Sequence, residues 1–462
     1  MLNIKTNSRV VLPGDTFVAI SGNTVDGHDF IHQAIKNGAV KIIAEKGSYE
    51  VDTEIVSNSK DYLIDYLVKN FSEELSSLKL VGITGTNGKT TTCFMVYEML
   101  LKLGVKAAYV GTIGLYINGK LIRELPNTTP DVLETYNILF EAKENNVEIV
   151  VMEASSHALE LNRLAGLKFN IGGFTNLTQD HLDFHGTMEN YLNAKKKIQN
   201  ILTSNGIMIV NADDEYHKHF CEKRFLTFGN NGDNYKFKDI VLKQGTTEIN
   251  FIGPDKREYK VETNFTGNYN VYNYILALAF VVELSFEIEE IIKITSDIFP
   301  PKGRCQSILA NGINIVVDYA HTPDAVRSII DTFNEIKAGK VITVIGCGGD
   351  RDATKRPIMG AVASDNSDFV VFTNDNPRTE DEKKIMQDIL NGVSKDNYIV
   401  EHDREKAIQK AIKKANPGDA VLILGKGHED YQIIGNKKIH LDDMAIVEEY
   451  IKKPEFLDKN TQ

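Results

Sequence analysis

The sequence has few cysteines and no long apolar run. Its four cysteines are widely separated and lack C-x-x-C or other zinc spacing, which favours four reduced thiols: Cys93, Cys221, Cys305 and Cys347. No stretch of about 18 apolar residues could cross a bilayer. The first residues, MLNIKTNSRVV, contain no signal-peptide core. These absences predict a cytoplasmic protein without membrane insertion.

Basic residues are also fewer than acidic ones: the chain has 52 Lys and Arg, 64 Asp and Glu, and a formal net charge of −12. General binding to nucleic acid or to a membrane surface needs a basic face, so both classes are excluded. The 42% hydrophobic and 25% charged composition is typical of a globular protein. Its 462 residues suit about three domains. No feature indicates an oligomer, and a monomer is the default expectation.

The segment Val81–Thr92, VGITGTNGKTTT, predicts a phosphate-binding loop. A buried strand at Leu78–Ile83 precedes it, and Thr90–Leu103 has helical periodicity. The glycines would turn backbone N–H groups inward, and the helix N-terminus would favour an anion. We expect ATP to contact Gly85, Thr86, Asn87, Gly88, Lys89, Thr90 and Thr91, with Lys89 at a terminal phosphate and the Thr90 hydroxyl on Mg²⁺.

Strands that alternate with helices predict an α/β protein of three domains. Residues 1–77 form a small N-terminal α/β domain with strands around Asp15–Ile20 and Lys41–Glu45. Residues 78–298 form a central P-loop ATPase domain with a mainly parallel sheet, in which Asn230–Glu262 is an antiparallel insertion. A turn at Pro300–Gly303 leads into a Rossmann-like α/β domain, residues 299–462. Its expected strands are Ile313–Asp318, Val341–Gly346, Asp368–Thr373 and Ala420–Gly425.

Ligands of such sheets bind at the carboxyl ends of the strands. Glu153 follows the apolar run Val147–Met152, where its carboxylate could hold Mg²⁺, although it could also be an N-cap acid of the next helix. His181 and Asp180 follow the expected strand Ile171–Leu177 and could reach the same metal. The expected helix Glu189–Ile201 carries three successive lysines, Lys195, Lys196 and Lys197. Such a run is usually a solvated face, yet one of the three can point inward.

Several longer motifs are similar to the Mur ligase family: GTNGKTTT, MEASSHAL, NLTQDHLDFHGTMENYLNAKKKI, GNYNVYN and DYAHTPDAV. The resemblance is to the members that add the third residue to UDP-N-acetylmuramoyl-L-alanyl-D-glutamate. It implies that Lys195, in Tyr191-Leu-Asn-Ala-Lys, is carbamylated to N6-carboxylysine and helps hold a second Mg²⁺. Asn270 and Asn273 would lie near the nucleotide, and Arg304 would reach its phosphates.

The resemblance also implies a substrate site for the UDP-MurNAc-dipeptide. Ser8 and the segment 23–25 would contact UDP, although by their residues alone these stretches could be structural turns. The sugar-peptide part would meet Asn127, Thr128, Thr129, Ser155 and Arg163. Arg163 is a credible carboxylate clamp from its chemistry alone.

The third expected domain ends its strands in arginines and a glutamate, a pattern that fits an amino acid with an extra amino group and an extra carboxylate. Surface salt bridges are the alternative. The Asp375-Asn-Pro-Arg motif resembles the meso-diaminopimelate-adding members of the family. The residue set that the resemblance implies is Arg351, Asp375, Asn376, Pro377, Arg378, Gly425 and Glu429.

The predicted function is an ATP-dependent amide ligase of peptidoglycan precursor synthesis that works through an acyl phosphate. A related enzyme that adds L-lysine or another amino acid is an alternative, as is a folylpolyglutamate- or cyanophycin-type ligase. A non-catalytic nucleotide-binding relative is less favoured, because Glu153, His181 and Lys195 are all present.

Overall fold

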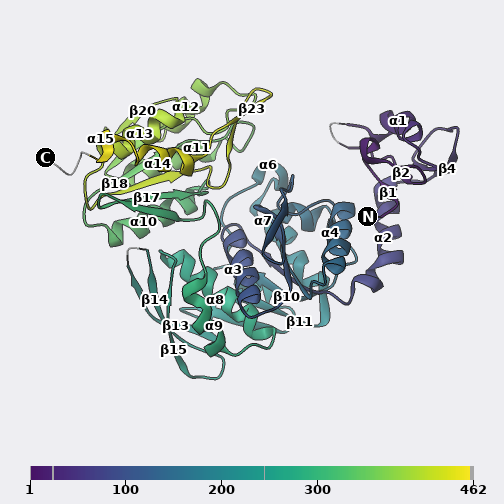
Figure 1. Ribbon diagram of the computed structural model, residues 1–462, viewed down its shortest axis with the longest axis horizontal. Helices are drawn as coiled ribbons and strands as arrows, with labels where there is room; N and C mark the ends of the chain where they lie inside the picture. The colour runs from purple at the N-terminus through teal and green to yellow at the C-terminus, as the bar shows by residue number, and fades with distance from the viewer. Residues whose placement is uncertain (1, 23–24, 244, 458–462) are drawn as a thin grey trace. The chain divides into compact units, whose positions relative to one another are not determined.

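The computed structural model describes residues 2–22, 25–243 and 245–457 (Figure 1). The chain forms two compact units: Met1–Gly82, Val105–Gly172 and Lys197–Gly206 make up the first, and Ile83–Gly104, Gly173–Lys196 and Ile207–Gln462 the second. None of the helices in the described ranges has both the length and the apolar character needed to cross a membrane.

The chain opens on a parallel four-stranded sheet, ordered β1 (Ile4–Lys5), β2 (Thr16–Val18), β3 (Lys41–Ala44) and β4 (Asp52–Ile55). Helix α1 (Ile31–Lys36) buries Ile31 and Ala34 in the same core as Phe17 and Ile42. Helix α2 (Ser59–Leu75) begins after Asn58, whose side chain accepts a hydrogen bond from the Asp61 N–H and so caps the helix. The predicted α/β fold of this N-terminal part is confirmed.

Eleven strands form the largest sheet, in the order β15-β14-β13-β12-β11-β10-β5-β9-β6-β7-β8. Their bounds are β5 (Lys79–Thr84), β6 (Ala107–Gly111), β7 (Gly114–Ile117), β8 (Lys120–Arg123), β9 (Ile149–Glu153), β10 (Phe169–Phe174), β11 (Leu202–Asn211), β12 (Phe225–Gly229), β13 (Tyr235–Leu242), β14 (Thr247–Ile252) and β15 (Glu258–Thr263). Strands β13, β14 and β15 pair antiparallel, as predicted for the insertion. Strands β7 and β8, which were not predicted, add a second antiparallel edge.

The helices between these strands are α3 (Lys89–Lys102), α4 (Val132–Glu144), α5 (Ser156–Glu160), α6 (Leu182–His185), α7 (Met188–Lys196), α8 (Asn268–Glu283) and α9 (Ile288–Ile294). The predicted strand, loop and helix around Gly85 are therefore present. Strand β10 ends at Phe174 rather than Leu177, because Asn176 bonds to the phosphate loop instead of extending the strand. The helix expected to run to Ile201 ends at Lys196 and continues as a 3-10 turn, Lys197–Ile201.

A six-stranded sheet follows in the second unit, in the order β16-β17-β21-β18-β19-β20 (Figure 1). Its strands are β16 (Gln306–Ala310), β17 (Ile313–Asp318), β18 (Val341–Ile345), β19 (Phe369–Phe372), β20 (Tyr398–Val400) and β21 (Ala420–Leu424). All its pairs are parallel except β16 with β17. The four predicted strands are confirmed, whereas the two edge strands and the hairpin β22 (Tyr431–Ile434) and β23 (Lys437–His440) were missed.

Helices cover both faces of this sheet: α10 (Pro323–Ile336), α11 (Lys355–Asn366), α12 (Glu382–Leu390), α13 (Arg404–Lys414) and α14 (Asp443–Tyr450). Strand β21 shows how the sheet is buried. Leu422 and Leu424 join the core beneath α10, α11 and α12, while Val421 and Ile423 join the core beneath α13 and α14. Successive side chains of a strand point to opposite faces, so a parallel strand covered on both sides is a continuous apolar run.

A buried ion pair joins α13 and α14 at the end of β21. Arg404 Nε and Nη2 donate to the two carboxylate oxygens of Asp443 at 2.8 and 2.7 Å, and neither side chain is exposed. Arg404 Nη2 also donates to the carbonyl oxygen of Leu424 at 3.0 Å. Since Gly425 follows directly, this pair fixes the start of the loop that carries Glu429.

Replacing Asp443 by Asn should lower the free energy of unfolding of this part of the chain by about 3–5 kcal/mol, because a buried guanidinium loses its counter-charge. Urea titration followed by circular dichroism would measure the change. Lys406→Ala is the control, since it breaks an exposed pair with Asp403 on the same helix and should change little. Equal effects of the two substitutions would contradict a structural role for the buried pair.

Candidate active site

The loop Gly85–Gly88 lies between β5 and α3, and two positions in it admit only glycine. Gly85 has φ of +147° and Gly88 has φ of +86°. A Cβ on Gly85 would lie 1.8 Å from Thr175 Oγ1, and one on Gly88 would lie 2.3 Å from Asn273 Oδ1. The loop is therefore pressed against two neighbouring side chains and could not accept even alanine without moving.

The segment after β10 braces this loop. The carbonyl oxygen of Asn176 accepts the Thr86 N–H at 2.8 Å, and its Oδ1 accepts the Asn87 N–H at 2.9 Å. Thr175 Oγ1 donates to the Asn87 carbonyl at 2.6 Å, and Thr86 Oγ1 accepts the N–H of Thr178 at 3.0 Å. These bonds fix the conformation of the loop.

Two lysines reach the same backbone oxygen in this loop. Lys89 Nζ donates to the carbonyls of Gly85 at 3.0 Å and Thr86 at 2.8 Å. Lys195, on α7, donates to the Gly85 carbonyl at 2.6 Å and lies 4.3 Å from the centroid of the Tyr191 ring. The side chain predicted to turn inward from the three-lysine run is thus Lys195, which is 1% exposed.

Burial lowers the pKa of Lys195 well below its usual value of 10.5, and repulsion from Lys89 lowers it further against the attraction of Asp180. A buried amine of this kind loses its proton readily. Lys195 is consequently a candidate for chemistry that needs a neutral amine. Lys196 and Lys197 instead form ion pairs with Glu222 and Glu160.

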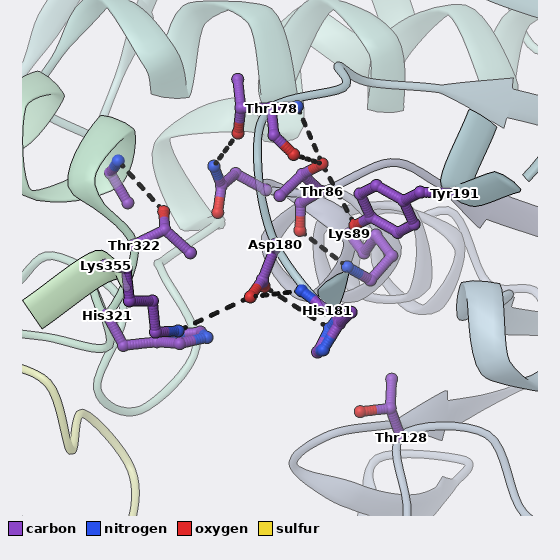
Figure 2. Close-up of polar contacts among 12 residues, drawn as sticks. Thr86, Lys89, Thr128, Thr178, Asp180, His181, Tyr191, His321, Thr322 and Lys355 are labelled. Atoms are coloured by element: carbon purple, nitrogen blue, oxygen red, sulfur yellow. Dashed lines mark hydrogen bonds and ion pairs between the residues drawn. The ribbon is translucent and has the colours of Figure 1, made fainter. Parts of the chain in front are cut away.

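Asp180 lies near the basic side chains of His181, His321 and Lys355 (Figure 2). Its carboxylate lies 3.5 Å from Lys355 Nζ and 3.4 Å from His181 Nε2. Burial alone would raise the pKa of Asp180, but the charges of His181, His321 and Lys355 outweigh it and hold the pKa below its usual range. Burial also lowers the pKa of His321. The carboxylate is therefore ionised and shared among groups from three segments of the second unit.

Helix α8 and the segment before β16 complete the surroundings of the loop. Asn273 Oδ1 accepts a hydrogen bond from Thr92 at 3.3 Å, and its Nδ2 donates to Asn270 Oδ1 at 3.1 Å. Arg304 Nη2 donates to Thr90 Oγ1 at 3.1 Å, and the guanidinium lies 4.4 Å from the Tyr319 ring centroid. The residues predicted for the nucleotide in the second unit therefore meet around one loop.

The same connecting segment touches the loop after β21. Lys302 Nζ forms a 2.8 Å ion pair with Asp442, and a Cβ on Gly303 would lie 2.0 Å from the backbone nitrogen of His428. Residues 302–304 thus contact both the phosphate loop and the glycine-rich loop Gly425–Glu429.

Glu153 is the last residue of β9 in the first unit, and it is fully buried. Tyr109 donates to its Oε1 at 2.6 Å, as does the Thr112 N–H at 2.8 Å, while the Thr112 hydroxyl donates to Oε2 at 3.2 Å. The cap of the next helix is Ser155. The N-cap alternative for Glu153 is therefore not what the structure contains.

The predicted sugar-peptide residues lie together in the first unit. Thr129 Oγ1 donates to the Glu153 carbonyl at 2.7 Å and to Ser155 Oγ at 3.1 Å, and its carbonyl accepts Arg163 Nη1 at 2.9 Å. The Thr128 hydroxyl is 3.1 Å from that of Thr112. Asn127, which precedes Thr128 in the sequence, is exposed. Together these residues form a polar cluster that contains one guanidinium group, that of Arg163.

Ser8 stands apart from this group, in the 3-10 turn Ser8–Val10. It is buried, and its carbonyl oxygen accepts a hydrogen bond from Asn37 Nδ2 at 2.7 Å. Of the predicted uridine segment 23–25, residues 23 and 24 lie outside the described residues. The structure therefore gives no geometry for that contact.

The predicted amino-acid residues meet where β19 and β21 end. Asn376 Nδ2 donates to Glu429 Oε2 at 2.8 Å, and Asp375 Oδ2 faces the α-carbon of Gly425, where a Cβ would approach it to 2.8 Å. Arg378 has φ of +53° and donates from Nη1 to the Gly349 carbonyl at 2.8 Å. Of the three remaining residues of the set, Arg351 is exposed, and Pro377 and Gly425 contribute through the backbone.

Sequence reasoning missed several residues that the structure brings to these sites: Thr175, Thr178, His321, Lys355 and Lys426. Thr178 and His321 lie in motifs already singled out, and Thr175 lies in an expected strand, but the roles were assigned to neighbouring residues. Lys426 lies between two predicted site residues, Gly425 and Glu429, whereas Lys355 lies in no such segment. Neither lysine was assigned a role, because a lysine beside other polar residues is usually solvated. Only their burial distinguishes them.

Oxygen donors for Mg²⁺ are present, but the described residues contain no cluster of three His, Cys, Asp or Glu side chains that could hold a metal. Mg²⁺ is commonly held by one or two carboxylates together with substrate phosphates and water. The buried Thr90 hydroxyl in the second unit is an oxygen donor of the right type for such a site, and so, taken by itself, is the buried Glu153 carboxylate in the first unit. Thr90 therefore fits an ion that arrives with a nucleotide.

The shifted pKa of Lys195 predicts a pH dependence of stability. Between its folded pKa and 10.5, the unfolded chain binds the additional proton, so the free energy of unfolding rises with pH across that window. In buffer free of carbon dioxide, the difference in unfolding free energy, wild type minus Lys195→Met, should therefore increase with pH. Urea titrations from about pH 7 to pH 10 would measure it. Lys196→Met is the control and should give no such trend; a flat difference for Lys195→Met would refute the assignment.

Three family models match the chain in succession. The Mur ligase family catalytic domain matches residues 2–71, the Mur ligase middle domain residues 83–281, and the Mur ligase glutamate ligase domain residues 303–427. Similar proteins named UDP-N-acetylmuramoyl-L-alanyl-D-glutamate--2,6-diaminopimelate ligase come from Clostridium botulinum (40% identity, 97% of this chain and 95% of the relative) and Aquifex aeolicus (40%, 97% and 93%). A solved structure of a protein of that name has 30% identity and a TM-score of 0.68, covering 97% of this chain and 94% of its own. The chain belongs to the Mur ligase family.

Proposed function

We propose that this ligase adds meso-diaminopimelate to UDP-N-acetylmuramoyl-L-alanyl-D-glutamate at the expense of ATP. The observation that carries the proposal is the similarity, over nearly the whole length, to relatives named for that reaction. The Asp375-Asn-Pro-Arg motif supports the same amino acid. The three successive family matches support domains 1–77, 78–298 and 299–462 as the sites for the UDP-substrate, ATP and the amino acid.

The reaction would proceed in two steps. A carboxylate of the dipeptide attacks the γ-phosphorus of ATP, which forms an acyl phosphate and releases ADP. The neutral amine of the amino acid then attacks the acyl carbon, and inorganic phosphate leaves as the amide forms. Phosphoryl transfer depends on positioning and on neutralising charge. Lys89, at the phosphate loop, and Arg304, bonded to Thr90, would supply positive charge there.

Mg²⁺ would neutralise phosphate charge when bound, as a Lewis acid. The residues assigned to hold it are Thr90, Glu153, His181 and Lys195 as its carbamate. Carbamylation joins the Lys195 nitrogen to the carbon of CO₂ with loss of one proton, so it needs the neutral amine. The depressed pKa of Lys195 supports that modification.

Arg163 and Arg378 would each bind a carboxylate, since a guanidinium offers five N–H donors and pairs with carboxylates in a fork. Arg378 donates one of these N–H groups to the Gly349 carbonyl, which orients the guanidinium and leaves its other N–H groups for a ligand. L-Lysine has no second carboxylate for Arg378 to bind. This difference supports diaminopimelate over the lysine-adding alternative.

Phosphate release tests the reaction directly. With ATP, Mg²⁺ and UDP-MurNAc-L-Ala-D-Glu, release should depend on meso-diaminopimelate and be near background with L-lysine or with no amino acid. A preference for lysine would refute the choice of amino acid but leave the ligase reaction. Release with a folate or with an acidic peptide as acceptor, and none with the UDP-substrate, would refute the proposal altogether.

Removing the Arg378 guanidinium tests how the amino acid is chosen. Arg378→Ala should raise the KM for meso-diaminopimelate about tenfold to a hundredfold, the size expected for lost charge-assisted hydrogen bonds. The smaller response to L-lysine should change little, so discrimination between the two should fall. Arg224→Ala, which removes an exposed arginine paired with Glu283, is the control. Unchanged discrimination in Arg378→Ala would contradict its role.

A further inference from the structure

Lys426 is a lysine with no exposed surface, in the loop that follows β21. Its Nζ lies 3.1 Å from Glu429 Oε2 and 3.3 Å from Asn376 Oδ1. The ammonium is 5.4 Å from the centroid of the Tyr431 ring. A buried cation is costly unless it is paired and hydrogen-bonded, and these groups provide that pairing.

Lys426 helps to set the orientation of the Asn376 amide. Asn376 Oδ1 accepts from Lys426 Nζ and from the N–H of Ile433 at 2.9 Å. With two donors on the oxygen, the amide must turn its Nδ2 toward Glu429, to which it donates at 2.8 Å. A reversed amide would point its NH₂ at two donors and its oxygen at a carboxylate, so it would be unfavourable at every contact.

Further bonds tie the two loops into one body. Gln432 Nε2 donates to the Asp375 carbonyl at 2.6 Å, and the Arg378 N–H donates to the Ile433 carbonyl at 3.0 Å. Glu429 Oε2 receives both Lys426 and Asn376, and within the described residues its Oε1 has no hydrogen-bond partner. One carboxylate oxygen is therefore fixed from inside, while the other remains available to a ligand.

We propose that Lys426 is a positioning residue that presents Glu429 and Asn376 to the incoming amino acid. The inference rests on the proposed function and names a residue that the function did not use. The amine that attacks the acyl phosphate must be neutral, so the ammonium that Glu429 receives is the second amino group of the diamino acid. Lys426 half-neutralises Glu429 and keeps its free oxygen aimed at that ammonium.

Steady-state kinetics with a matched control test this role. Lys438 Nζ lies 3.8 Å from the same Tyr431 ring, but Lys438 is exposed and has no contact with Asn376 or Glu429 among the described residues. Lys426→Met should raise the KM for meso-diaminopimelate about thirtyfold or more, because one partner of a buried charge pair is lost. The KM for ATP and kcat at saturation should stay within about twofold of wild type. Lys438→Met should leave all three parameters unchanged.

An unchanged KM for diaminopimelate in Lys426→Met would overturn the proposal. So would a parallel loss of kcat and of affinity for both substrates, which would mark a role in folding alone. Lys426→Gln keeps a hydrogen-bond donor without the charge. It should fold if the methionine variant does not, and should show a smaller rise in the same KM.

A double substitution asks whether Lys426 acts through Glu429. In a Glu429→Gln background, adding Lys426→Met should raise the KM much less than it does alone, since the partner is already lost. Additive effects would overturn the mechanism proposed for Lys426. A wild-type enzyme that does not respond to diaminopimelate would refute the proposed function itself. A responsive wild type with a normal Lys426→Met variant would refute only the inference about Lys426.

Discussion

Two lysine side chains converge on a single carbonyl oxygen, that of Gly85. Two ammonium groups this close repel each other, so one of them must give up its proton or gain a negative partner. Burial, and to a lesser extent repulsion from Lys89, lowers the pKa of Lys195 well below its usual value. The braces from Thr175 and Asn176 hold the loop in the shape that creates this crowding. The lowered pKa of Lys195 thus depends first on its burial and then on the loop geometry that brings it near Lys89.

Much of this arrangement could be predicted from the sequence, because it depends on local patterns. Gly85, Gly88 and Lys89 follow an apolar strand at a recognisable spacing, and continuous apolar runs marked the parallel strands of the C-terminal sheet. The edge strands β16 and β20 were missed because half-exposed strands lack such a run. Lys355 and Lys426 were missed because burial of a lysine depends on distant segments that fold over it.

The sites differ in how they hold charge. Around Asp180, one buried carboxylate is shared among several cations, and the balance favours its ionised form. At Glu429, one buried cation pairs with one carboxylate oxygen, and among the described residues the other oxygen accepts no hydrogen bond. Low dielectric strengthens both arrangements and makes any unmatched charge costly.

Within the segment Lys302–Arg304, Arg304 bonds to Thr90 in the first turn of α3, Gly303 packs against the loop Gly425–Glu429, and Lys302 pairs with Asp442. Three consecutive residues span only about 10 Å even when fully extended, so there is no slack between these contacts. Inserting or deleting one residue here would therefore displace Thr90 and the loop Gly425–Glu429 relative to each other. The length of this short connector, more than its composition, thus sets the distance between Thr90 and the loop Gly425–Glu429.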